Sequence, residues 1–305
     1  MLEITATMPL AMLPSGHLKG VFLTTAGILI LSPDALLLRL IGADIWTLLF
    51  WRGLLCAIGL VGITLLLDRS DGFRRLFAIG RPELQIIAVN ACMHVLFVLA
   101  ILNTTVANVL VIMSISPLLG AILSRFVLGE PVARRTWYTT VAVFIGLVLI
   151  FSQSLGGGTL VGDLSAFAVA VLLACNFVLL RRYRKVSMIP AVAWSMAVTA
   201  VIAWPLAIPA SLDDMGWVYT LLLGLVILPV SSALITLGPR YLPAPEVGLI
   251  MLLETLLGPL WVWLVIHEVP SIETLIGGTM ILATLTWMSI AAIRDGRPGI
   301  PQAPK

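Results

Sequence analysis

Four ionisable residues stand inside long apolar stretches of this 305-residue chain, where a charged side chain is costly. An ionisable group in a hydrocarbon environment costs about 2.5–3.5 kcal/mol on insertion scales, so each one needs a structural or functional reason. A carboxylate there can bind an ammonium group or a proton, a guanidinium can hold a carboxylate, and an imidazole titrates near neutral pH. The four residues are Asp34, Arg52, His94 and Glu254.

Glu254 is the clearest candidate for a functional group. It lies well inside the apolar stretch 245–266, and Gly258 and Trp261 follow at i+4 and i+7 on the same face of a helix. One hypothesis is that Glu254 contacts a substrate ammonium group or a proton, or couples the two. The other is that it is a buried, hydrogen-bonded carboxyl group that stabilises helix packing. The sequence leaves both open.

Arg52 follows Trp51 and is a candidate to hold a substrate carboxylate. The alternatives are that it pairs with a carboxylate such as Asp34, or that its side chain extends to an interface. Asp34 itself follows Pro33, and proline removes one backbone hydrogen bond and favours a kink whose freed carbonyls can face a cavity. A wet position near the end of the segment is the alternative for Asp34.

Polar residues on neighbouring apolar segments extend this list of candidates. Asn90 and His94 are one helical turn apart, so they either line a substrate path together or are satisfied residues inside a helix bundle. Asn176 and Asn108 are expected to make interhelical hydrogen bonds first and ligand contacts second.

Tryptophan side chains are a further source of binding surface. An apolar pocket with a few polar groups would suit an aromatic or aliphatic amino acid, and indole rings can stack on it or bind its ammonium group. The alternative is ordinary packed or lipid-facing bulk. Five tryptophans are expected to lie deep within the apolar segments: Trp51, Trp194, Trp204, Trp261 and Trp263. Of these, Trp51 and Trp261 adjoin the ionisable candidates.

The elements that must position these residues are long apolar helices. The chain is 60% hydrophobic and 11% charged, with a mean hydropathy of +1.10. About twenty residues in a helix rising about 1.5 Å each cross a hydrocarbon layer about 30 Å thick. The sequence therefore predicts an all-α integral membrane protein with ten transmembrane helices. They are expected at 20–38, 45–67, 85–102, 105–128, 136–153, 162–181, 190–210, 216–237, 245–266 and 273–293.

The positions of the basic residues predict the orientation. With the N-terminus in the cytoplasm, 16 of the 18 Lys and Arg residues fall on the cytoplasmic side of the ten spans. Arg39 alone lies on the opposite face, and Arg52 lies inside a span. Because basic residues in short loops stay in the cytoplasm, both tails, 1–19 and 294–305, are expected there.

The two halves of the chain resemble each other. Shifting the first half by 138 residues places Asn108 on Glu246 and Glu130 on Glu268, and a shift of 142 places Arg39 on Arg181. Five spans in each half mean that two tandem copies insert with opposite orientation. We therefore expect an inverted repeat of 20–153 and 162–293, with a binding site near the midplane between the halves. The alternative is that duplication only enlarged a helix bundle.

The internal repeat also draws attention to Ser232. It falls on His94 under the repeat offset, and it follows Pro229 in the eighth predicted span. A helix broken at this proline, opposite the third span, would be a suitable place for a gate or a binding site.

Several other function classes are disfavoured. The net charge of +3 resides in loops next to the membrane, where anionic lipid explains it without nucleic acid. An intramembrane enzyme would need a motif such as H-E-x-x-H, and the chain has none; nor has it a phosphate-binding G-x-x-x-x-G-K-[ST] loop. The sequence indicates no cofactor and no metal. A channel stays an alternative, although it would more naturally repeat a charged ring by oligomerisation.

Short motifs recur at matching positions in both halves. The first half has Ile115-Ser116-Pro117-Leu118 and Leu128-Gly129-Glu130-Pro131; the second has Pro243-Ala244-Pro245-Glu246, Leu253-Glu254, His267-Glu268-Val269-Pro270 and Gly277-Gly278. Over its whole length the chain resembles the EamA branch of the drug/metabolite transporter superfamily. Thr255 departs from the family, which often has proline after this glutamate, so the kink is expected to be displaced to Pro259. Size and aromatic content are similar to bacterial amino-acid exporters of the YddG type.

The resemblance implies a secondary transporter that exports amino acids or similar small metabolites by alternating access. It also implies the inner membrane of a bacterium. Partners would be the lipid bilayer, the substrate and protons, and a monomer suffices because both halves are in one chain. The alternative is transport of another metabolite or a drug. The expected substrate-binding residues are Glu254, His94, Asn90, Trp51, Asn176, Trp261, Arg52 and Ser232.

Overall fold

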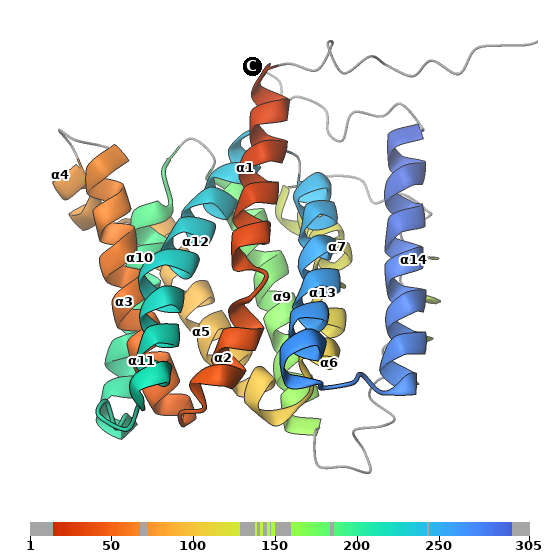
Figure 1. Cartoon of the computed structure of the whole chain (residues 1–305). Coiled ribbons are helices and arrows are strands. Elements are labelled where there is room, and N and C mark those ends of the chain that lie inside the picture. The colour runs from red at the N-terminus through yellow and green to blue at the C-terminus, as the bar shows by residue number, and fades with distance from the viewer. Residues whose placement is uncertain are drawn as a thin grey trace, which may run out of the picture.

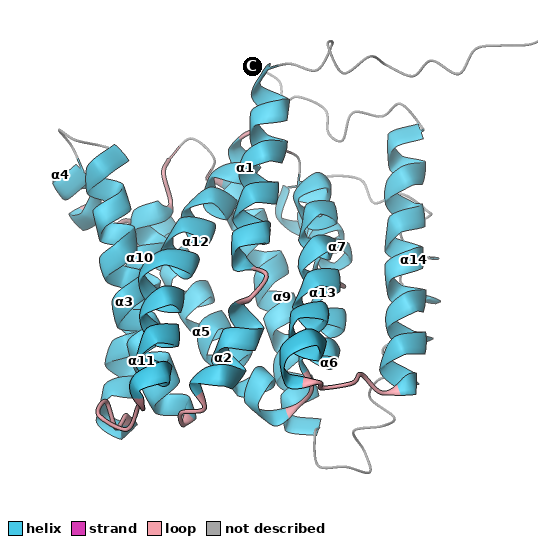
Figure 2. Cartoon of the chain, viewed as in Figure 1, coloured by secondary structure: helices cyan, strands magenta, loops and turns pink. Residues whose placement is uncertain are grey.

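A computed structural model describes residues 15–67, 72–128, 138, 141–142, 145–146, 148–149, 160–183, 186–242 and 244–294. All regular secondary structure in these residues is helical (Figure 2). The fifth predicted span lies largely outside the described residues, and Glu130 and the tails 1–14 and 295–305 lie wholly outside them.

Where the structure describes the chain between two helices the connection is short, and most of the described helices run roughly along one common direction (Figure 1). In the first half they are α1 (Ser15–Leu31), α2 (Asp34–Ile41), α3 (Ile45–Leu67), α4 (Gly72–Phe77), α5 (Arg81–Asn103), α6 (Val106–Met113) and α7 (Ser116–Leu128). In the second half they are α9 (Leu160–Arg182), α10 (Ile189–Ala203), η2 (Trp204–Leu206), α11 (Asp214–Leu221), η3 (Leu222–Ile227), α12 (Leu228–Leu237), η4 (Gly238–Arg240), α13 (Ala244–Ile266) and α14 (Ile272–Arg294).

Seven helical segments of the described residues are long and apolar enough to cross a membrane, with mean hydropathies between 1.7 and 2.3. They are Leu18–Ile41, Ile45–Leu67, Arg81–Asn103, Val106–Val127, Leu160–Arg182, Ile189–Leu206 and Asp214–Arg240. Two shorter apolar stretches, Leu253–Ile266 and Ile272–Thr284, lie within the 23-residue helices α13 and α14.

Prolines affect the predicted spans in different ways. The first span is broken at Ser32 and Pro33, as the kink hypothesis expects. The fourth predicted span, 105–128, corresponds to the apolar segment Val106–Val127, but its helix is interrupted: α6 ends at Met113 and α7 begins at Ser116. Pro117 has no N–H to bond the carbonyl of Met113, so the helix can stop there.

Pro229 has the opposite outcome, because the chain stays helical through it. The segment before it, Leu222–Ile227, is a π-helix, which accommodates the missing hydrogen bond without a break. The expectation of a broken helix at this proline is therefore wrong. The seventh span also ends earlier than 210, because α10 passes into the 3-10 turn η2 near Pro205, and this leaves Trp204 at a helix end and 60% exposed.

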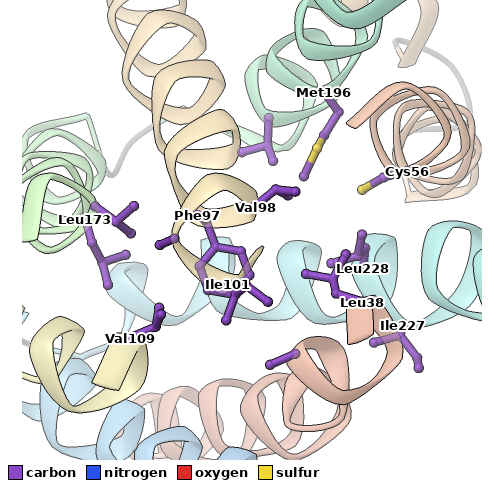
Figure 3. Packing of buried hydrophobic residues seen from close by; sticks show 14 of the residues in the cluster. Leu38, Cys56, Phe97, Val98, Ile101, Val109, Leu173, Met196, Ile227 and Leu228 are labelled. Carbon is purple, nitrogen blue, oxygen red and sulfur yellow. The ribbon is translucent and has the colours of Figure 1, made fainter. Parts of the chain in front are cut away.

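The centre of the bundle is an apolar core to which both halves contribute. Helix α10 packs along α3 and α5, α5 along α9, and α1 along α12 and α13. Figure 3 shows where the two halves meet: Phe97 and Val98 of α5 lie near Met196 of α10, Leu38 of α2 and Leu228 of α12. Gly53 permits the closest of these approaches, since a β-carbon there would lie 2.6 Å from the carbonyl oxygen of Met196.

Asp44 caps the start of α3. Its Oδ1 accepts hydrogen bonds from the backbone N–H groups of Trp46 (2.9 Å) and Thr47 (3.1 Å), which α3 itself leaves unpaired. Partial burial acts to raise the pKa of Asp44, but the hydrogen bonds from Thr47 and Trp46 outweigh it and lower this pKa below its usual value.

Replacing Asp44 with alanine is expected to destabilise the protein by about 1 kcal/mol at pH 7. Because the folded-state pKa of Asp44 is depressed, this stabilisation is complete above the unfolded-state pKa of about 3.9 and disappears as the pH falls through the folded-state pKa. Melting temperatures of the two proteins should therefore converge in acid. A difference that stays constant from pH 7 into acid would contradict the prediction. Asp44→Asn, which keeps a neutral cap, is the control.

Candidate functional site

The break between α1 and α2 places Asp34 at the start of α2, where it is buried and paired with Arg52 of α3. Nη2 of Arg52 donates to Oδ2 of Asp34 at 2.7 Å, and Nη1 donates to Oδ1, so the pair is bidentate. The two side chains are only 4–5% exposed. Of the three possibilities for Arg52, the structure therefore has the pairing with Asp34, and Asp34 does not occupy a wet position.

Two further ionisable residues join this pair. Glu254 of α13 is buried, the Nε2 of His94 of α5 is buried, and both residues lie within electrostatic range of the Asp34–Arg52 pair. Asp34, Arg52, His94 and Glu254 are called the charged core below. The guanidinium of Arg52 also lies over the ring of Phe97, 5.5 Å from its centroid, which supplies a cation–π contact in addition to the ion pair with Asp34.

Glu254 lines a small cavity at the break between α6 and α7. The other lining residues are Leu110, Met113, Ser114, Ser116, Pro117, Leu173, Met251 and Thr255. The cavity measures about 20 Å³, enough for one water molecule. Glu254 is 8% exposed, and Thr255 donates a 3.4 Å hydrogen bond to the carbonyl of Leu110, which ties α13 to the interrupted helix. A carboxyl group beside an interrupted helix can exchange a proton or meet an ammonium group.

His94 has a polar ring atom with no partner among the residues that the structure describes. Its Nε2 is buried and has no hydrogen-bond partner within the described ranges. Its neighbour one turn earlier, Asn90, donates instead to the carbonyl of Ile86 (3.0 Å) and to Oδ1 of Asn176 (2.9 Å). Asn90 and Asn176 thus link α5 to α9 by the interhelical hydrogen bond expected of Asn176.

Trp261 contacts the broken helix directly. Its Nε1 donates to Oγ of Ser32 at 3.0 Å, so α13 carries both Glu254 and the residue that holds the break between α1 and α2. Trp261 is 38% exposed, so its ring is only partly packed against the protein.

Trp51 belongs to an aromatic cluster next to Arg52. Its ring meets those of Phe50 and Trp217, and its Nε1 donates to the carbonyl of Pro209 at 3.1 Å. With Arg52 it also lines a cavity of about 10 Å³ that includes Thr47 and Thr220. Ser232 is half-buried on α12 and makes no hydrogen bond to another candidate within the part of the chain described.

Sequence reasoning missed the polar lining beside Glu254. Ser114 stands at the end of α6, and its Oγ donates to the carbonyl of Val111 at 2.6 Å. A signal for it is present in the sequence, because Pro117 three residues later disfavours helix at this point. Thr255 stands out in the sequence only as a departure from a motif, although its hydroxyl bonds the carbonyl of Leu110 in the broken helix.

The sequence pattern of the EamA-like transporter family matches the chain twice, over residues 18–152 and 160–290. The chain belongs to the EamA-like transporter family. This EamA protein is therefore a multi-pass membrane protein of a family that transports small molecules, and the family's members are transporters and not enzymes. Its surroundings are a lipid bilayer, and its substrate is a small molecule.

Two other comparisons concern relatives. No curated protein matches the EamA protein. A solved structure named "Crystal structure of protein" is similar over 90% of this chain and 99% of its own, with a TM-score of 0.66 and 20% sequence identity. At that identity the likeness shows a shared fold, and that name states no activity.

Proposed function

We propose that this EamA protein is a ten-helix secondary transporter that exports amino acids by alternating access. The observation that carries the proposal is the buried charged core, in which the bidentate pair of Asp34 and Arg52 lies at a broken helix beside Glu254 and His94. A zwitterion carries the same two charges as this ion pair. Its carboxylate would replace Asp34 on Arg52, and its ammonium group would bind Asp34 or Glu254.

The two cavities beside the core support a closed state. They measure about 10 and 20 Å³, whereas small-molecule sites usually enclose about 300–1,000 Å³. A substrate can enter only if helices around the core separate, which is the motion that alternating access requires. The apolar and aromatic surroundings, with Phe97 and Trp261, favour a substrate with an aliphatic or aromatic side chain.

Two inverted repeats, 20–153 and 162–293, are part of the proposal. The start of α1 and the end of α14 lie at the same end of the bundle as α4 (Figure 1), which supports an even number of crossings. The exposed arginines of α4 support a cytoplasmic location for that end and for both tails. A bacterial inner membrane and kinship with YddG-type exporters are further parts of the proposal, supported by size and aromatic content.

Flux assays in proteoliposomes test the proposed function. Vesicles preloaded with unlabelled amino acids should accumulate a radiolabelled amino acid by counterflow, with saturable kinetics and competition by one amino-acid class. The controls are vesicles without the protein and proteoliposomes that contain the protein but no preloaded amino acid. Flux that does not saturate and shows no counterflow would identify a channel instead. Counterflow with another metabolite or a drug, and none with amino acids, would refute the substrate class.

A further inference from the structure

Arg39 joins three segments at the end of the bundle opposite α4. It lies in the last turn of α2, and its Nη2 donates to the carbonyl of Thr104 at 2.6 Å, between α5 and α6. The same Nη2 is 3.7 Å from Oε2 of Glu268, in the connection from α13 to α14. Both charged side chains are about one-quarter exposed, at 27% and 23%.

Glu268 completes the link from the other side. Its Oε1 accepts a 3.0 Å hydrogen bond from the backbone N–H of Val106, at the start of α6, where the helix has unpaired donors. His267 directs it there, because its φ of 60° is left-handed and its N–H closes α13 by bonding the carbonyl of Trp263 at 3.1 Å. Arg39, Thr104, Val106 and Glu268 are called the Arg39 cluster.

The turn that the Arg39 cluster holds is also held by α9 and α14. A β-carbon at Gly162 of α9 would lie 2.8 Å from the backbone nitrogen of Thr104, so the two segments are in close contact. Asn108 bonds Oγ1 of Thr104 at 3.2 Å and accepts a hydrogen bond from Thr274 of α14. Segments of both halves thus converge on one turn.

The Arg39 cluster is mechanically connected to the charged core through two helices. Helix α2 carries Asp34 and, five residues later, Arg39, a distance of about 7.5 Å along the axis. Helix α13 carries Glu254 and leads into His267 and Glu268. A movement of α2 relative to both α3 and α13 that releases Asp34 from Arg52 would therefore also pull Arg39 away from Glu268.

We infer that the Arg39 cluster is the gate that closes the transport pathway at the face opposite α4. The inference rests on the alternating access of the proposed function, but on no particular substrate. The cluster has several contacts, which together can hold the pathway closed. The ion pair of Arg39 and Glu268 is partly exposed and therefore weak, so it can separate in each transport cycle.

Thiol labelling tests the gate without a transported substrate. The three native cysteines are replaced with alanine, and a single reporter cysteine is introduced at Ser32 or, separately, at His94. A membrane-impermeant thiosulfonate is applied to each membrane face in turn, using intact cells and inverted vesicles. Arg39→Gln and Glu268→Gln should each raise the labelling rate from the face opposite α4 by about tenfold. From the α4 face, the labelling rate should be unchanged or reduced.

Two comparisons make this test specific. The double variant should label as fast as either single variant, because both changes open one gate. Arg74→Gln, an exposed arginine of α4, should leave both rates unchanged. Unchanged labelling in Arg39→Gln and Glu268→Gln, or an equal increase from both faces, would overturn the inference. If labelling increases only from the face opposite α4 but the protein shows no amino-acid counterflow, the gate is supported and the proposed substrate class is refuted.

Discussion

Arg52→Gln is expected to destabilise the EamA protein by about 3–5 kcal/mol and to abolish transport, and Asp34→Asn is expected to do the same. Each single change leaves the other charge buried and without its partner. The remaining environment supplies little compensation, since Phe97 offers Arg52 only a cation–π contact and both side chains of the pair are at most 5% exposed. Melting temperatures and counterflow rates measure the two effects.

The double variant Asp34→Asn/Arg52→Gln separates stability from function. It removes both charges, so the melting temperature should recover much of the loss seen in either single variant. Counterflow should stay absent, because a substrate carboxylate then has no guanidinium to bind. A double variant that transports normally would show that the pair only stabilises the fold. Arg74→Gln is the matched control, because this arginine is exposed on α4.

Glu254→Gln is expected to remove the pH dependence of uptake and to lower its rate by about tenfold, roughly 1.4 kcal/mol. Glutamine has nearly the same shape but cannot exchange a proton or bind an ammonium group by charge. The cavity beside Glu254 has room for about one water molecule, through which a proton could reach the carboxyl group. Uptake into proteoliposomes across a series of pH values measures the effect.

His94→Ala tests whether the imidazole takes part in the same proton exchange. Its buried Nε2 has no hydrogen-bond partner within the described ranges and is therefore available to a proton, so loss of the imidazole should also flatten the pH profile. Glu273→Gln, an exposed carboxylate at the start of α14, should keep the wild-type profile. Proton coupling at the charged core would be eliminated by unchanged pH dependence in both Glu254→Gln and His94→Ala.

The residues of the charged core can be named from the sequence, and their pairing only in part. Charge inside an apolar helix is conspicuous, because hydrocarbon excludes it unless it is used or compensated. The pairing of Arg52 with Asp34 is one of three alternatives that the sequence leaves open. Choosing among them needs the break between α1 and α2, which turns Asp34 inward, and this depends on how α13 holds Ser32 through Trp261.

The consequences of the prolines could not be predicted from local rules alone. Proline removes one hydrogen bond wherever it stands, yet the helix stops before Pro117, whereas the chain stays helical through Pro229 after a π-helical segment. Neighbouring helices decide between these outcomes. A hydroxyl of α13 reaches the carbonyl of Leu110 near the first proline, while Gly59 of α3 lies against the ring of Pro229 at the second.

The sequence alone determined that the chain is helical and membrane-embedded, and which family it belongs to. Those properties follow from segment length, hydropathy and motif spacing, which are local features and can be read directly from the sequence. Tertiary structure decided which residues meet: Arg39 with Glu268, Trp261 with Ser32, and Glu254 with the break in the fourth span. Each contact joins segments more than a hundred residues apart. Side-chain partners at that separation are set by the packing of the helices, which the periodicity of the sequence does not indicate.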